Sequence, residues 1–182
     1  MKKVLISILA LCVSILYANA QIWQSRNVNI HFFSSTPIED INATSKSAGA
    51  AINAATGKIY FTVDIITFKF AKSLMEEHFN ENYMESEKYP KAVFDGQILN
   101  MTDFSKDGEY KVNIKGKFTV HGVTQDREIA ATLNVSGGVI KGKSVFKVKC
   151  VDHKINIPKL VVKNIAEEIE VTVNCELLPK KN

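Results

Sequence analysis

The sequence lacks the short motifs that mark most catalytic and phosphate-binding sites. It has no Gly-x-Ser-x-Gly elbow, no His-Glu-x-x-His helix, no Cys-x-x-Cys pair and no glycine-rich phosphate loop. Its histidines are far apart and lack the spacing of metal ligands; they are His31, His78, His121 and His153. We therefore expect a protein that is not an enzyme, with no catalytic residues, no metal and no cofactor.

Clustered positive charge is also missing. The chain has 23 lysines and arginines against 19 aspartates and glutamates, and the lysines are dispersed instead of forming a basic stripe. Nucleic-acid binding needs such a stripe. We expect no nucleic-acid partner.

Cysteine is scarce, with Cys12, Cys150 and Cys175 as the only examples. If the strands around Cys150 and Cys175 are antiparallel neighbours, the two residues lie about eight positions apart along them, roughly 26 Å at 3.3 Å per residue. A disulfide needs Cα atoms within about 7 Å of each other. This register favours two buried thiols over a disulfide.

Long apolar runs are absent except at the start of the chain. Lys2 and Lys3 precede an apolar stretch from Val4 to Tyr17, and Ala18-Asn19-Ala20 places small residues at the −3 and −1 positions. This layout predicts a signal peptide over residues 1–20, cleaved after Ala20. The remaining residues, 21–182, have the size of one domain. We expect a periplasmic or secreted protein with no integral membrane segment after cleavage.

What the sequence does have is period-2 alternation of apolar and polar residues, which is typical of strands with one buried face. The inward rows include Val112 to Val120, Ile129 to Val135, Ile140 to Cys150 and Ile169 to Leu177. Shorter rows occur in residues 28–32, 59–65 and 94–98, and a weaker strand is expected within Ile41 to Ile52. Seven or eight strands with short turns predict an all-β, antiparallel domain, either one closed sheet or a sandwich.

One segment departs from this alternation. Its apolar residues recur at helical spacing; they are Phe70, Leu74, Met75, Phe79 and Tyr83. Ser73 and Glu76 have the spacing of a capping box, and Pro90 prevents continuation. The pattern predicts a short helix from Leu74 to Met84. Its apolar stripe has two interpretations, as core packing on the sheet or as a lid over an apolar cavity.

The histidines have structural interpretations. His31 falls on the outward side of its strand, His121 lies in a turn beside Gly122, and His153 lies near Asp152. On the helix, only Glu81 is spaced to face His78, which is too few ligands for zinc. We expect His78 to have a capping or lid-packing role.

Three stretches of the sequence resemble the YceI-like, polyisoprenoid-binding family of exported bacterial proteins. They are residues 82–94 (NYMESEKYPKAVF), 116–124 (GKFTVHGVT) and 56–63 (TGKIYFTV). The resemblance runs from about residue 25 to the C-terminus. It implies an antiparallel lipocalin-like barrel of about eight strands, with the short helix covering one end and an isoprenoid-like lipid inside. The chain departs from the family at residues 74–79, which contain no arginine or aspartate.

These expectations combine into a binding protein that holds a lipid or isoprenoid small molecule for sequestration or transport. The predicted lumen and lid residues are Phe61, Val63, Ile65, Leu74, Met75, Phe79, Tyr83, Phe94, Ile98, Ile114, Phe118, Leu133, Phe146 and Val148. Two alternatives remain open: an extracytoplasmic enzyme with His78 or His121 as base, and a filled barrel that binds proteins. The sequence leaves the oligomeric state open, a homodimer included.

Overall fold

The described chain is a β-sheet with one short helical segment. The computed structural model describes residues 22–100, 103–158 and 165–180, so the predicted signal peptide lies outside the described residues. Over the described ranges the sheet has nine strands: β1 (Ile22–Ser35), β2 (Asp40–Asn53), β3 (Lys58–Asp64), β4 (Lys69–Phe70), β5 (Lys91–Ile98), β6 (Gly108–Val120), β7 (Val123–Ser136), β8 (Val139–Lys149) and β9 (Glu168–Pro179).

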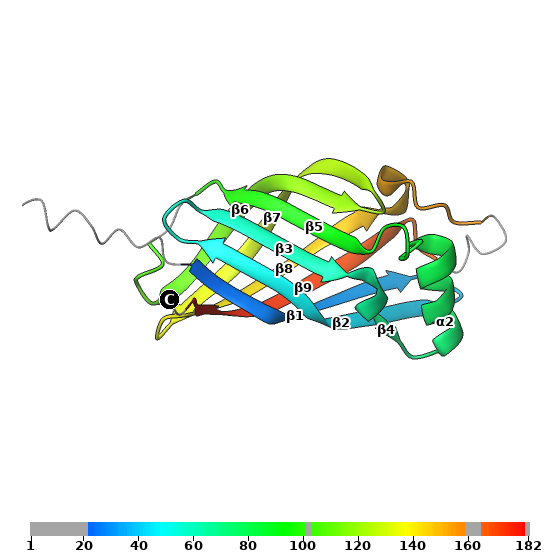
Figure 1. Ribbon diagram of the computed structural model, residues 1–182, viewed down its shortest axis with the longest axis horizontal. Coiled ribbons are helices and arrows are strands. Elements are labelled where there is room, and N and C mark those ends of the chain that lie inside the picture. Colours follow the sequence, from blue (N-terminus) through cyan, green and yellow to red (C-terminus); the bar gives the residue numbers. More distant parts are fainter. Residues whose placement is uncertain (1–21, 101–102, 159–164, 181–182) are drawn as a thin grey trace, which may run out of the picture.

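The sheet closes on itself into an antiparallel barrel (Figure 1). Its order is β1-β9-β8-β7-β6-β5-β3-β2, and β1 also pairs with β2, so the eight long strands leave no open edge. The two-residue strand β4 adds to β2 at Ala43 and Thr44. The prediction of a barrel of about eight strands is confirmed, and closure decides between the closed sheet and the sandwich.

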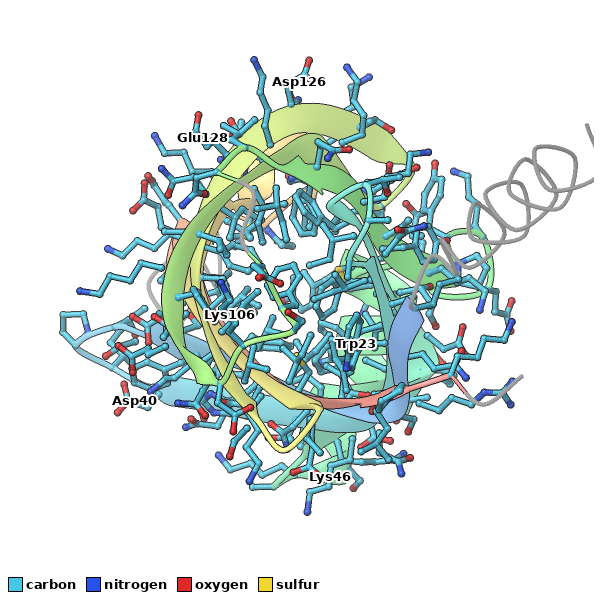
Figure 2. All side chains as sticks on the ribbon, turned by 90° about the vertical axis from the view of Figure 1, so that its left-hand side faces the viewer. Trp23, Asp40, Lys46, Lys106, Asp126 and Glu128 are labelled. Carbon is cyan, nitrogen blue, oxygen red and sulfur yellow. The ribbon has the colours of Figure 1, made fainter. Side chains whose placement is uncertain are left out.

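The predicted inward rows form the lumen. On β6, Val112 and Ile114 are buried and alternate with exposed polar residues, and on β7 Leu133 and Val135 are buried on either side of exposed Asn134. Figure 2, which looks along the barrel, shows charged side chains such as Asp126 and Glu128 pointing outward from the ring. Burial of one face of every strand is the main source of stability in such a sheet.

Strand β2 is longer than the sequence predicts. We expected a weak strand within Ile41 to Ile52, because alanine and serine have low strand propensity. The structure shows fourteen residues, paired with β1 along most of their length and with β3 and β4 on the other side. Ala48 and Ala50 are buried. Pairing on both sides therefore overrides the local propensity.

One end of the barrel is packed with side chains. Trp23 and Phe104 meet there edge to face, with ring centroids 6.5 Å apart, and both are almost fully buried. The Trp23 indole donates a 2.9 Å hydrogen bond to the carbonyl of Gly138 in the β7–β8 turn. This is the closed end.

The helical segment lies at the opposite end (Figure 1). It consists of α2 (Ser73–His78) and a π-helical turn, η2 (Phe79–Tyr83). The Asn80 side chain donates to the carbonyl of Glu76, within the region where the helix widens. Two short 3₁₀ turns, η1 (Ile65–Thr67) and η3 (Cys150–His153), lie at the same end.

The predicted capping box is wrong. Ser73 is the first helical residue, and Lys72 occupies the N-cap without a side-chain hydrogen bond. The Glu76 carboxylate instead accepts bonds from the Lys69 ammonium and from the backbone N–H of Phe70. Glu76 therefore bonds to both residues of the short strand β4 instead of capping the helix.

The close approach of β5 to β6 depends on two opposed glycines, Gly96 and Gly116. A Cβ atom added at Gly116 would lie 2.6 Å from the Gly96 Cα atom, which is closer than van der Waals contact allows. We expect Gly116→Ala to lower the free energy of unfolding by about 1–3 kcal/mol, because the added methyl forces the two backbones apart.

Urea unfolding of the purified protein measures this effect. Gly49→Ala is the matched control, since a Cβ atom there would meet its nearest neighbour, a Thr62 methyl, at an ordinary 3.6 Å. Equal losses in the two variants would contradict the close-approach explanation.

Candidate ligand-binding cavity

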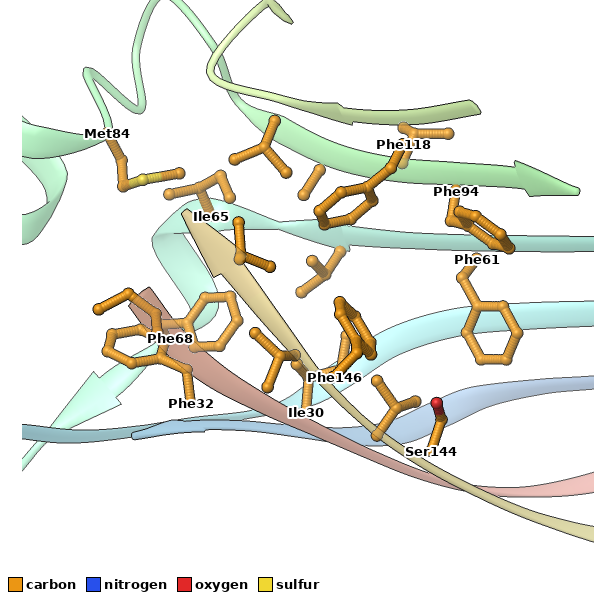
Figure 3. A pocket seen from close by; sticks show the side chains of 18 of the residues that line it. Ile30, Phe32, Phe61, Ile65, Phe68, Met84, Phe94, Phe118, Ser144 and Phe146 are labelled. Atoms are coloured by element: carbon orange, nitrogen blue, oxygen red, sulfur yellow. The ribbon is translucent and has the colours of Figure 1, made fainter. Parts of the chain in front are cut away.

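The half of the barrel toward α2 is hollow. Its cavity has a volume of about 380 Å³ and is lined by residues from all eight long strands. This volume falls within the roughly 300–1,000 Å³ typical of small-molecule sites. Figure 3 shows the side chains around it, most of them aliphatic or aromatic.

Four phenylalanines hold the helical segment against the barrel and form what we name the lid cluster: Phe32, Phe68, Phe70 and Phe79. Their ring centroids are between 5.0 and 5.8 Å apart. All four also line the cavity. Phe79 therefore fits both interpretations of the helical stripe, core packing and lid, because it packs against rings of the barrel and also lines the cavity.

A second group of aromatic rings lies along the cavity wall. Phe118 contacts Phe94 at 6.4 Å and Phe146 at 5.9 Å between ring centroids, and in both pairs the rings meet edge to face. Figure 3 shows these three rings with Phe61. Such walls suit hydrocarbon because they provide dispersion contacts without hydrogen-bonding groups.

Few of the lining residues have polar side chains. They are Ser34, Glu39, Thr62, His78, Tyr83, Lys143 and Ser144. Ser34 already accepts a hydrogen bond from the N–H of Ala166, and Glu39 forms an ion pair with Lys72. The interior is thus built for an apolar guest.

The structure brings most of the predicted site residues together. The cavity is lined by Phe61, Val63, Ile65, Met75, Phe79, Tyr83, Phe94, Ile114, Phe118, Leu133, Phe146 and Val148. Their role in binding a ligand stays a prediction.

Two predicted residues lie elsewhere. Leu74 is 59% exposed, because it projects from the outer side of the single α-helical turn while Met75 faces the cavity. Ile98 is fully buried but lies toward the closed end, where its N–H donates to Gly57. Alternation indicated that Ile98 faces inward but could not show its depth along the barrel.

Sequence reasoning missed several lining residues. Ile155, Ile157 and Ile165 come from the connection between β8 and β9. The alternating Ile155-Asn156-Ile157 before Pro158 was the available signal. We had treated that stretch only as a connection.

His121 joins three segments at the helix end. One of its ring nitrogens lies 2.8 Å from the Glu85 carboxylate and the other 3.1 Å from the carbonyl of His153. The Tyr89 ring packs edge-on against it, at 4.6 Å between centroids. The predicted structural role of His121 is confirmed, and these contacts link the 84–90 loop to the β6–β7 turn and η3.

His153 is fully buried beneath this arrangement. Its Nδ1 atom lies 3.1 Å from the carbonyl of Val123, and its ring packs edge-on against Phe118. Burial lowers the pKa of His153, because the imidazolium would lose its hydration. Its structural role is confirmed as well.

The other two histidines are peripheral. His31 contacts the Asn42 side chain at 3.0 Å, and His78 ends α2 at the cavity rim with an exposed side chain. In the part of the chain that the structure describes, no three His, Cys, Asp or Glu side chains gather as a candidate metal site.

Both cysteines line the cavity as free, buried thiols, as predicted. Cys175 lies opposite Gly142 of β8, whereas Cys150 is the first residue of η3, just past the far end of β8. Burial raises the pKa of both thiols, that of Cys175 to about 11. They therefore stay protonated at neutral pH and add apolar surface to the wall.

No helix within the described ranges is long and apolar enough to cross a membrane.

Comparison with known proteins gives a consistent result. The chain matches the YceI-like domain over residues 24–177. No curated protein matches it.

Three similar solved structures illustrate the fold. Burkholderia cenocepacia BcnA has a TM-score of 0.69 and 16% identity, covering 82% of this chain and 95% of BcnA. A polyisoprenoid-binding domain from Saccharophagus degradans, implicated in plant cell wall breakdown, has a TM-score of 0.73 and 12% identity, covering 88% and 99%. The Campylobacter jejuni YceI protein has a TM-score of 0.62 and 17% identity, covering 77% and 85%. At these identities the likeness shows the fold alone.

The Glu85–His121 contact predicts a pH-dependent contribution to stability. The hydrogen bond with His121 holds the pKa of the Glu85 carboxyl below its ordinary value of 4.5. A lowered pKa stabilises the fold above the unfolded-state pKa, and this contribution is lost as the pH falls through the folded-state pKa. We expect Glu85→Gln to lower the urea midpoint at pH 7, with the difference from wild type shrinking below about pH 4.5.

Urea titrations at several pH values test this. Glu87→Gln, in the same loop and exposed, serves as the control and should leave the midpoint unchanged. A Glu85→Gln difference that is constant from pH 7 to pH 3 would rule out the ionic contact as its cause.

Proposed function

Because this chain belongs to the YceI-like family, we propose that it is an exported binding protein whose barrel holds a long apolar lipid, isoprenoid or quinone-like, for sequestration or transport. The observation that carries this proposal is the cavity of about 380 Å³ with its almost wholly apolar wall. The Saccharophagus degradans domain, similar in fold, is a polyisoprenoid-binding domain and supports the ligand class.

The energetics favour a tail that binds without specific polar contacts. Burying ten methylene groups offers on the order of 8 kcal/mol. The loss of translational and rotational freedom subtracts several kcal/mol from that gain. A linear tail therefore retains useful affinity, and its chemistry matters less than its length and flexibility.

Binding without catalysis fits the histidines. Both ring nitrogens of His121 are engaged, one by Glu85 and one by the backbone, so neither is directed at a guest in the cavity. His78 lies on the exposed rim. The Saccharophagus degradans domain of similar fold is likewise a binding domain.

A space-filling substitution tests the cavity as the binding site. Ala131 lines the cavity, whereas its neighbour Ala130 is exposed on the outer face of β7. We expect Ala131→Phe to weaken binding of retinol, a fluorescent isoprenoid alcohol, by at least about tenfold, or about 1.4 kcal/mol. Ala130→Phe should stay within about twofold of wild type. Fluorescence titration measures both, after circular dichroism has shown that both variants are folded.

Extraction of the natural protein tests the same proposal independently. Protein purified from its own host is extracted with organic solvent, and the extract is analysed by mass spectrometry. We expect a lipid with a long apolar tail. Repeated absence of any lipid, together with no uptake of added retinol, quinone or prenol, would refute lipid binding.

Export is part of the proposal and has its own test. The layout of residues 1–20 supports a cleaved leader, and cleavage after Ala20 gives a mature chain that begins at Gln21. Intact-mass analysis of protein recovered from the periplasm and the medium should give the mass of residues 21–182. Full-length protein confined to the cytoplasm would contradict export.

A further inference from the structure

The backbone ladder between β7 and β8 ends earlier than the ladders on either side of it. β6 and β7 pair up to their connecting turn, and β8 and β9 pair up to Lys149. In contrast, β7 and β8 pair only from their own turn to Thr132 and Lys143. Beyond that pair, residues 123–131 and 144–149 face each other across a gap, which we name the seam.

Polar side chains cross the seam in place of backbone bonds. The Ser144 hydroxyl donates to the carbonyl of Ala130 at 2.7 Å, and the Arg127 guanidinium donates to the carbonyl of Lys147. At the helix end, the Gln125 amide donates to the carbonyl of Asp152 at 2.9 Å. These side-chain bonds connect the two sides of the seam, but they do not form a backbone ladder.

These side chains belong to inward-facing positions of their strands, yet at the seam they bond to carbonyl groups instead of pointing into the lumen. Gln125 and Arg127 belong to the inward row of β7, and Ser144 belongs to the inward row of β8. In an unbroken sheet they would point into an apolar lumen, where an unpaired polar group is costly. At the seam Ser144 and Arg127 donate to strand carbonyl groups beyond the last β7–β8 pair, and Gln125 donates to a carbonyl of η3.

The cavity extends to the seam. Its lining includes Ile129 and Ala131 on β7, and Ser144 and Phe146 on β8. It also includes Lys143, although Lys143 is exposed on the outer face of β8. Lys143 forms the last β7–β8 pair, with Thr132, so it lies at the edge of the seam. Figure 3 shows Ser144 beside Phe146 at the edge of the cavity.

The seam also requires less disruption to open than the helix end does. Opening the helix end separates the lid cluster and the segments joined through His121. Opening the seam breaks side-chain hydrogen bonds, whose donors and acceptors then bind water, and separates the Phe118 and Phe146 rings. No ladder bond has to break.

We propose that the seam is the doorway of the cavity and the resting place of the ligand's polar end, and that this end is acidic. The idea rests on the proposed function. The tail passes between β7 and β8 into the apolar lumen, and the head stays among the donors of Ser144, Arg127 and Lys143. Carboxylate and phosphate accept hydrogen bonds from such groups more strongly than a neutral hydroxyl does.

Crosslinking the seam tests the doorway. Ala130→Cys with Val145→Cys places two thiols on the outer face, next in register beyond the last backbone pairs. Asn134→Cys with Lys141→Cys gives the same link within the paired part of the ladder. Both pairs are made with Cys150 and Cys175 replaced by alanine and are closed with dibromobimane.

Stopped-flow fluorescence then measures retinol uptake. We expect the seam link to slow uptake at least tenfold and the control link to leave it within twofold of the unlinked protein. Uptake unchanged by the seam link overturns the doorway. Absence of retinol binding by the unlinked protein overturns the proposed function instead, so the two failures are distinct.

Replacing Lys143, at the end of the paired β7–β8 ladder beside the seam, tests the head group. Retinoate and retinol share one tail and differ at the polar end. We expect Lys143→Gln to weaken retinoate binding at least fivefold while changing retinol binding by less than twofold. The control is Lys141→Gln, on the same face of β8 but beside the closed ladder. An equal loss in the control assigns the effect to general surface charge and overturns the acidic-head assignment.

Discussion

The pairing of β1 with β2 is the interaction on which the rest of the structure depends, because it closes the sheet. A strand row with one apolar face can be stable only if that face is covered, and closure covers every row with the opposite wall of the barrel. Closure also removes the exposed edges that would otherwise pair with other chains. The cavity follows from it: the eight long strands enclose a lumen that the inward side chains fill at the Trp23 end and leave hollow toward α2.

The two halves of the barrel therefore perform different tasks. At the closed end, Trp23 and Phe104 meet edge to face, and the tryptophan indole is anchored to the β7–β8 turn. At the other end, the lid cluster packs along the wall, so its rings cover the opening without filling the space beneath. An apolar cavity forfeits dispersion contacts along its lining, and a hydrocarbon guest restores them.

Alternation in the sequence predicted the barrel and most of the cavity wall because its period is local and survives in the folded strand. It says nothing about depth, so Ile98 was assigned to the cavity although it lies toward the closed end. Helical spacing identified the stripe that contains Phe79. In the short helix, however, Met75 faces the cavity while its neighbour Leu74 points to solvent. The length of β2 came from its neighbours on both sides, and the partner of Glu76 came from β4, a strand of two residues. None of these is readable from a single segment.

The inward rows of β7 and β8 contain polar residues, which the alternating pattern alone does not explain. On the adjoining strands, Gln125 lies opposite Phe118, Arg127 opposite Gly116 and Ser144 opposite Val173. In a sealed apolar lumen each would be unfavourable, and in a regular ladder none would be needed, because backbone groups satisfy one another. Their side chains become favourable only where the two strands part. In our proposal the guest is exchanged where the wall is held by side chains instead of by the backbone, and these three residues lie at that place between β7 and β8.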